Sequence, residues 1–146
     1  MCDIFWNNCR TGNLELIKTF LKSNKIYIHT SCEHGFRLAC INNHLHVMKY
    51  LALLYKTGYC NIININICRE YAFRYGCYNI NINIVKFLTY LHRKDKNYSS
   101  INIYEKSLYG DCFRSLYNID NNSRKKLVKY LYNLGNYREH LITVDI

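Results

Sequence analysis

Cysteine and histidine are the residues of this sequence that could carry metal chemistry, because thiolates and imidazoles are the usual ligands of zinc. The chain of 146 residues contains eight cysteines and six histidines. Zinc sites often use two cysteines separated by two residues, and no such pair occurs here. A site made by Cys32, Cys60, Cys68 and His34 is the remaining arrangement, and incidental thiols are the simpler interpretation. The sequence therefore predicts no metal and no other cofactor.

Catalytic motifs are also missing from the sequence. It has no glycine-rich phosphate loop and no nucleophile elbow. Its ten acidic residues are scattered singly, so general acid–base catalysis has few candidates. We therefore expect a protein that is not an enzyme.

Three of the cysteines recur at one position of an internal repeat. Each of three phenylalanines is followed four residues later by a cysteine and thirteen residues later by a lysine. The three sets are Phe5, Cys9 and Lys18; Phe36, Cys40 and Lys49; and Phe73, Cys77 and Lys86. A divergent fourth copy begins at Phe113 and lacks the cysteine. We predict that these three cysteines pack between the repeats as small apolar residues.

The stretch from Phe36 to Leu51 indicates which structure each copy forms. Its apolar residues keep helical spacing on both sides of a polar break, Asn42-Asn43-His44. This pattern predicts a short helix, a tight turn and a second helix. Two helices of this length are marginal in water by themselves. The repeats are therefore expected to stack into an all-α solenoid that shares one core.

The spacing of the copies divides the chain into about four helix-turn-helix units within a single domain, residues 1–146. The units cover approximately residues 4–31, 32–68, 69–99 and 100–146. Finger loops are expected to connect them. In the longest connection, residues 56–68, Gly58 can end the preceding helix. We interpret the alternation of Asn and Ile that follows as an elongated, hairpin-like finger rather than a sheet strand, and give its low-complexity texture little functional weight.

Residues 36–51, FRLACINNHLHVMKYL, resemble the core of an ankyrin repeat, whose helices read roughly LHxAAxxGHLEVVKLL. Residues 12–18, GNLELIK, match the GHLEVVK part of that pattern. The overall sequence pattern is similar to that of divergent ankyrin proteins of large DNA viruses that infect amoebae. Three features depart from the family pattern: no Thr-Pro opens a helix, the turn glycine is kept only at Gly12, and two of the repeats are longer than the usual ~33 residues. The resemblance implies a non-enzymatic protein-interaction module, a scaffold or adaptor, that binds its partner through the concave face.

Ankyrin proteins contact partners through residues just before the first helix and at the turn between helices. Transferred to this chain, the resemblance implies Glu33, Gly35, Asn43 and His44 in the second unit and Arg69, Glu70, Ala72 and Asn81 in the third. We add Arg37 and Arg74, which together with Arg114 align one residue after the repeated phenylalanines and would form a ladder on the first helices. His44 also resembles the family's Gly-His turn, which favours a structural role for it.

The formal charge of +10 attracts anionic partners without identifying one. The arginine ladder could grip an acidic protein surface, or it could be only a solvated face. A second ladder lies on the second helices and consists of Lys18, Lys49, Lys86 and Lys129. Another protein, host or viral, is the partner we expect first. Nucleic acid is the alternative, bound by both ladders, the basic clusters at 93–96 and 124–126, and stacking tyrosines.

We expect no signal peptide at the start of the chain, and no run approaches the about 18 apolar residues of a membrane span. We therefore expect no membrane association. The cysteines are expected to be reduced, in the cytoplasm or nucleus, and in the host cytoplasm if the protein is viral.

Overall fold

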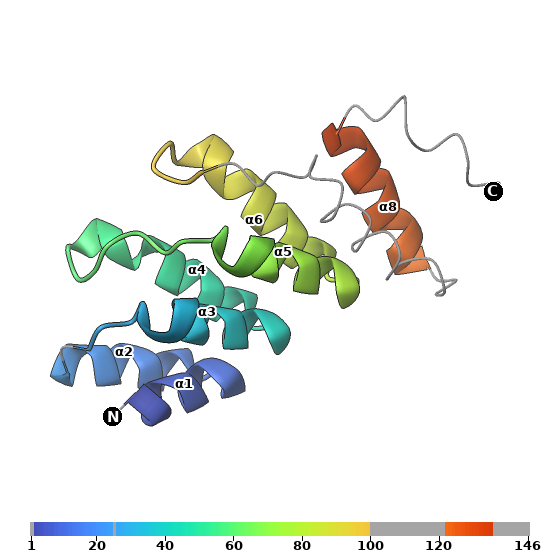
Figure 1. The fold of residues 1–146 in the computed structure, drawn as a ribbon. Helices are drawn as coiled ribbons and strands as arrows, with labels where there is room; N and C mark the ends of the chain where they lie inside the picture. The colour runs from blue at the N-terminus through green and yellow to red at the C-terminus, as the bar shows by residue number, and fades with distance from the viewer. Residues whose placement is uncertain (1, 25, 100–121, 136–146) are drawn as a thin grey trace.

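The computed structural model describes residues 2–24, 26–99 and 122–135 (Figure 1). Within these residues every regular element is a helix, which confirms the all-α fold. The helices are α1 (Cys2–Thr11), α2 (Leu14–Ser23), α3 (Thr30–Ile41), α4 (Leu45–Leu53), the 3₁₀ helix η1 (Leu54–Thr57), α5 (Ile67–Tyr78), α6 (Ile82–Lys94) and α8 (Asn122–Gly135). None of the described helices has both the length and the apolar composition needed to cross a membrane.

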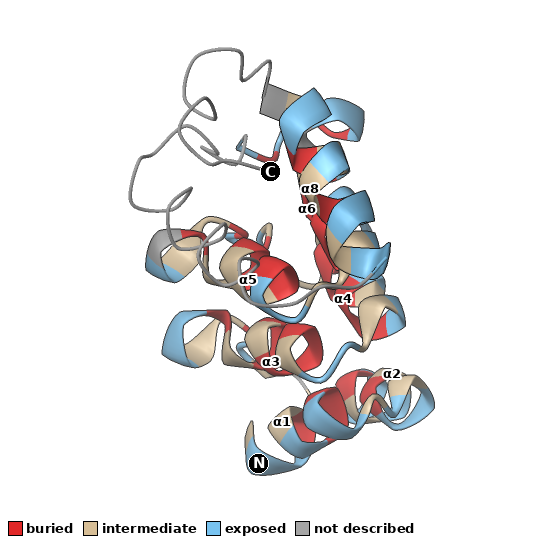
Figure 2. Cartoon of the chain, turned by 90° about the vertical axis from the view of Figure 1, so that its right-hand side faces the viewer, coloured by how far each residue is buried: buried red, intermediate tan, exposed pale blue. Residues whose placement is uncertain are grey.

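The helices form hairpins that stack side by side (Figure 1). Helix α1 pairs with α2, α3 with α4 and α5 with α6, while α8 packs beside α6. Figure 2 shows α1, α3 and α5 in one layer and α2, α4 and α6 in the other. We call α1, α3 and α5 the first helices, and α2, α4, α6 and α8 the second helices. Of the predicted fourth unit only α8 is described, because Phe113 and Arg114 lie outside the described residues.

The three hairpin turns share one geometry. Gly12, Asn43 and Ile80 each have a positive φ, of 75°, 63° and 53°. The following residue donates its backbone N–H to the carbonyl oxygen five residues earlier, from Asn13 to Asn8 at 3.0 Å, from His44 to Ala39 at 2.8 Å and from Asn81 to Gly76 at 2.7 Å. Such bonds satisfy carbonyl groups at the end of the first helix. The turn therefore forms without glycine in two units, at a cost of about 1–2 kcal/mol for each left-handed residue.

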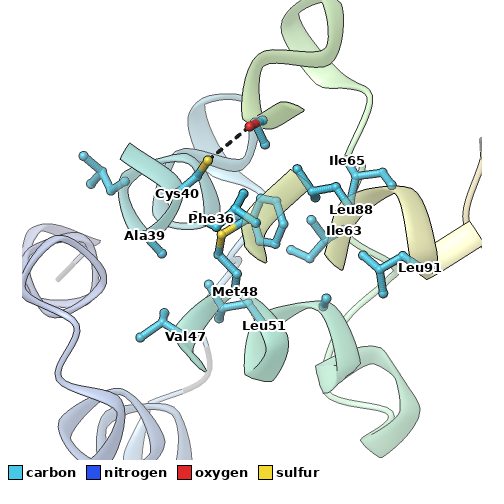
Figure 3. Close-up of a cluster of buried hydrophobic side chains, with 14 of the residues drawn as sticks. Phe36, Ala39, Cys40, Val47, Met48, Leu51, Ile63, Ile65, Leu88 and Leu91 are labelled. Carbon is cyan, nitrogen blue, oxygen red and sulfur yellow. Dashed lines mark hydrogen bonds between the residues drawn. The ribbon is translucent and has the colours of Figure 1, made fainter. Parts of the chain in front are cut away.

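Side chains from the repeat meet in a core between the two layers (Figure 3). The repeated phenylalanines and cysteines are all buried: Phe5, Phe36 and Phe73 are 1%, 2% and 2% exposed, and Cys9, Cys40 and Cys77 are 0%, 2% and 0% exposed. Sγ of Cys40 also donates to the carbonyl oxygen of Ala72 at 3.2 Å, which links α3 to α5 (Figure 3). The predicted packing role of these cysteines is confirmed.

The connection before α5 differs from the predicted finger. Gly58 ends η1 with a φ of 75°, as expected. Beyond it, Ile63 and Ile65 are each 2% exposed and lie in the same cluster as Phe36 (Figure 3), whereas Asn64 between them is exposed. The Asn/Ile alternation therefore places isoleucine on the core side and asparagine on the solvent side of an extended segment. The segment is anchored to the core and does not project as a hairpin.

Tyrosines in two connections bond back to the preceding unit. The hydroxyl of Tyr59 donates to the carbonyl oxygen of Asn24 at 2.9 Å and accepts from the backbone N–H of Ile26 at 3.2 Å. One unit later, the hydroxyl of Tyr98 donates to the carbonyl oxygen of Ala52. These tyrosines therefore hold neighbouring units together.

Asp95 reinforces the second of these links. Its Oδ2 accepts a hydrogen bond from the hydroxyl of Tyr55 and lies 3.0 Å from Nζ of Lys56. The bonds from Tyr55 and Lys56 lower the pKa of Asp95 to about 2. The carboxylate therefore stays ionised at neutral pH, and α6 stays tied to the end of the preceding hairpin.

Thiol labelling is expected to separate the buried cysteines from the exposed ones. Burial raises the pKa of Cys9 and Cys40 to about 12, so almost no thiolate is present at neutral pH. Cys32 and Cys68 are exposed. Iodoacetamide should modify Cys32 and Cys68 in the native protein on the order of 100-fold faster, because Cys9 and Cys40 react only after local opening. Peptide mass spectrometry over time measures the four rates, and similar rates would contradict the packing role.

Candidate partner-binding surface

Four of the predicted binding residues lie in the interior. Glu33, Glu70 and Ala72 are 4%, 6% and 3% exposed, and Gly35 is also buried. None of these four can form the contact surface of a partner, so the binding role expected at these four positions from the family pattern is wrong. Arg69 belongs to α5, but its side chain lies outside the described residues.

Gly35 and Ala72 are buried because neighbouring first helices pack closely at these positions. A Cβ atom on Gly35 would lie 2.7 Å from Cε1 of Phe5 in α1. Ala72, at the equivalent position in α5, accepts the bond from Cys40 of α3. Small residues here allow the backbones to approach each other, and so they serve the stacking of the units.

Glu33 and Glu70 are buried because left-handed turns at the start of α3 and α5 direct their carboxylates inward. The positive φ angles are 53°, 58° and 57° at Ser31, Cys32 and Glu33, and 54° and 56° at Cys68 and Glu70. Oε1 of Glu33 accepts from Nδ1 of His29 at 2.8 Å and from the backbone N–H of Asn64 at 3.1 Å. Oε1 of Glu70 accepts from the side-chain amide of Asn66 at 2.9 Å. Both carboxylates organise the connection before a first helix.

The predicted turn residues mostly bond to the turn of the preceding unit. Nε2 of His44 donates to the carbonyl oxygen of Arg10 at 2.9 Å, and the side-chain amide of Asn81 donates to Oδ1 of Asn43. Two more bonds of this kind join His46 to the carbonyl oxygen of Gly12 at 2.8 Å and Asn79 to that of Ile41 at 3.4 Å. The structural role predicted for His44 is confirmed. Asn43 is the exposed member of the predicted turn positions.

Arg37 and Arg74 occupy equivalent positions on α3 and α5, as the repeat predicted. Each is half-buried, and each donates from Nη2 to the carbonyl oxygen six residues earlier, Ser31 at 3.0 Å and Cys68 at 3.1 Å. Their guanidinium groups therefore brace the left-handed turns while lying at the surface of the first helices. Cζ of Arg37 also lies 4.9 Å from the centre of the Tyr71 ring in the next unit.

Aromatic rings continue this surface in both directions. On α1 the ring of Trp6 meets that of His34 edge to face, with centroids 4.9 Å apart, and on α5 the rings of Tyr71 and Tyr75 stack at 4.6 Å. Partial burial, aided by the cations Arg37 and Arg10, lowers the pKa of His34 and favours its neutral form. We define the first-helix surface as Trp6, His34, Arg37, Tyr71, Arg74 and Tyr75.

Sequence reasoning missed the aromatic members of this surface. The signal was present in the repeat: Trp6 stands where Arg37 and Arg74 stand, and His34 and Tyr71 each lie two residues before a repeated phenylalanine. The contacts of Trp6 with His34 and of Arg37 with Tyr71 are thus one contact made in successive units. Aligning the copies of the repeat and comparing the positions at which they differ would have identified this contact.

The cysteines and histidines that the structure describes do not gather into a metal site. In the described part of the chain, no group of three or more His, Cys, Asp or Glu side chains is placed to hold a metal ion. Cys32, Cys60, Cys68 and His34, all of which are described, therefore do not form the site considered from the sequence.

No protein-family model, curated protein or solved structure matches this chain. The ankyrin resemblance thus rests on residues 12–18 and 36–51 and on the copies of that pattern within the chain. The first-helix surface is described from the internal repeat and its own contacts.

Proposed function

We propose that this chain is a non-enzymatic protein-interaction module, a scaffold or adaptor built as an ankyrin-like solenoid, that binds a partner protein through the first-helix surface. Two parts of this proposal go beyond the all-α fold: the ankyrin-like architecture and the role in binding a partner. The three hairpins with one turn geometry support the solenoid, because stacked units of this kind present a preset surface.

The composition of the first-helix surface is the observation that carries the proposal. Trp, Tyr and Arg are the residue types that contribute most often to protein-binding energy, particularly when neighbouring contacts already fix their conformations. Here Arg37 is held by Ser31 and Tyr71, and Trp6 lies against His34. Little side-chain entropy remains to be lost when a partner covers these groups.

The charge of the same surface favours an acidic partner. The carboxylates of α3 and α5 belong to Glu33 and Glu70, and both are buried. Arg37 and Arg74 place two positive charges at this surface, whereas the carboxylates of the same two helices lie in the interior. An acidic surface would complement them and would also speed association.

Charge reversal at Arg37 and Arg74 is the test of this proposal. The double variant Arg37→Glu, Arg74→Glu is expected to weaken partner binding about 30-fold or more, because losing even one hot-spot residue costs roughly 2 kcal/mol or more. Partners are first identified by co-purification and mass spectrometry, and the affinity of each purified partner is then measured by calorimetry.

A matched variant separates local contacts from total charge. Lys22→Glu with Lys49→Glu changes the net charge by the same amount on exposed positions of the second helices and should bind normally. Circular dichroism must show that both variants keep their helices, because each arginine also braces a turn. Equal binding by a folded Arg37→Glu, Arg74→Glu variant would refute a role for the first-helix surface.

A further inference from the structure

The second helices carry many cations and almost no carboxylates. The sequences of α4, α6 and α8 contain no Asp or Glu, and their cations are Lys49, Lys86, Arg93, Lys94, Arg124, Lys125, Lys126 and Lys129. By contrast, Lys18 on α2 pairs with Glu15 at 2.7 Å. Asp95, directly after α6, is engaged by Tyr55 and Lys56. The formal charges carried by α4, α6 and α8 themselves are therefore all positive, and charges within the screening length, about 8–10 Å at moderate salt, reinforce one another.

A groove of about 710 Å³ crosses these helices. Helix α4 contributes Lys49 to its wall, α6 contributes Lys86, Phe87, Tyr90 and Arg93, and α8 contributes Tyr130. We call these six residues the basic groove. It lies on the second helices, and these form the layer opposite the first helices, which carry the first-helix surface (Figure 2). The two surfaces can therefore act independently.

Aromatic rings in the basic groove are held beside cations. Nζ of Lys86 lies 5.5 Å from the centre of the Tyr130 ring, and Nζ of Lys94 lies 5.2 Å from that of Tyr90. The hydroxyl of Tyr130 is also 2.6 Å from Oγ1 of Thr89. Tyr90 remains 50% exposed. Both rings are thus positioned in advance, and Tyr90 offers free surface to a ligand.

We propose that the basic groove binds single-stranded nucleic acid. Lys49, Lys86 and Arg93 face the phosphates, and the rings of Tyr90 and Tyr130 receive the bases. A positive groove combined with aromatic platforms is the arrangement that binds single strands without sequence preference. The groove volume is in the range of small-ligand pockets, which suits separated bases rather than a paired duplex.

The chemistry of the basic groove favours a nucleic acid over an acidic peptide. The face of an aromatic ring carries negative electrostatic potential, which repels a carboxylate but accepts a stacked base. Two of the three groove cations are lysines, which bind phosphate as point charges without the planar fork that recognises carboxylates. An acidic peptide would use the cations of the groove but not its rings.

Fluorescence anisotropy with labelled oligonucleotides of roughly 12 nucleotides, about the size bound by small single-strand domains, tests the proposal. Oligo-U RNA and oligo-dT DNA should both bind at about 50 mM salt, and affinity should fall steeply as salt rises. A duplex of the same length and a glutamate-rich peptide of similar charge should bind at least about tenfold more weakly. No binding of either single strand, or equal binding of the peptide, would overturn the proposal.

Matched variants locate the binding to the basic groove. Tyr90→Ala should weaken single-strand binding roughly tenfold, while Tyr90→Phe keeps the ring and should bind normally. Lys49→Ala with Lys86→Ala should reduce the slope of log affinity against log salt by about 1.4, from two lost phosphate contacts. Arg10→Ala with Lys22→Ala removes the same charge elsewhere and should leave the slope unchanged. Equal effects of the two double variants, or of the two Tyr90 variants, would show that the groove is not the site.

Discussion

Replacing Ile65 with asparagine is expected to lower the free energy of unfolding by about 3–5 kcal/mol. Ile65 is 2% exposed and belongs to the shared core, so the change removes buried apolar atoms and places an amide among carbon atoms. Truncating a buried isoleucine costs about 2–5 kcal/mol, and an unpaired buried amide adds to that cost. Urea unfolding followed by circular dichroism measures the loss.

The same substitution at Ile62 serves as the control. Ile62 is only half-buried in the same connection, so Ile62→Asn should cost much less, about 1 kcal/mol or below. Both variants make the same Ile→Asn change, so they have the same composition and differ only in the position of the asparagine. Similar losses at both positions would mean that the alternation does not direct isoleucine into the core.

Replacing Gly12 with alanine is expected to cost about 2–3 kcal/mol. Gly12 has a φ of 75°, and a Cβ atom there would lie 2.5 Å from Nδ1 of His44. The His44 ring cannot move away freely, because its Nε2 is bonded to the carbonyl oxygen of Arg10. The left-handed conformation costs about 1–2 kcal/mol, and losing that hydrogen bond adds about 1 kcal/mol. Thermal and urea unfolding measure the effect.

Gly58 provides the matched control for Gly12. It has the same φ of 75°, but a Cβ atom there would meet nothing within 4 Å. Gly58→Ala should therefore cost only the conformational part, about 1–2 kcal/mol. The difference between the two variants measures how firmly His44 is seated against the preceding turn, and equal losses would argue against that contact.

The repeat, the helical pairs and the buried cysteines were predictable because they follow from spacing alone. A phenylalanine followed by a cysteine four residues later marks one face of a helix, and three copies in register place that face in a shared core. The turn predicted at Asn42-Asn43-His44 lies between α3 and α4, although Asn43 stands where glycine would be expected. The run of polar residues indicated this turn more reliably than the presence of glycine.

The binding residues were harder to predict because position in a repeat does not state which way a side chain points. The left-handed turn at Ser31–Glu33 directs the side chain of Glu33 into the interior, whereas the prediction placed it at the surface. None of the three residues in this turn is glycine, so their residue types do not indicate a left-handed conformation. Gly35 was assigned to the surface although its missing side chain makes room for Phe5. The isoleucines at 63 and 65 were undervalued because their segment resembles biased composition, whereas period-two alternation alone would have assigned them to the core.

The links between successive units lie at both ends of the helices. His44 and Asn81 bond to the preceding unit at one end, and Tyr59 and Tyr98 bond to the preceding unit at the other. Because each hairpin is fastened to its predecessor at two separated points, shearing or twisting one against the next must stretch polar bonds as well as open the core. The stacked hairpins should therefore move as one rigid body, in which the distances between successive first helices are fixed before a ligand binds.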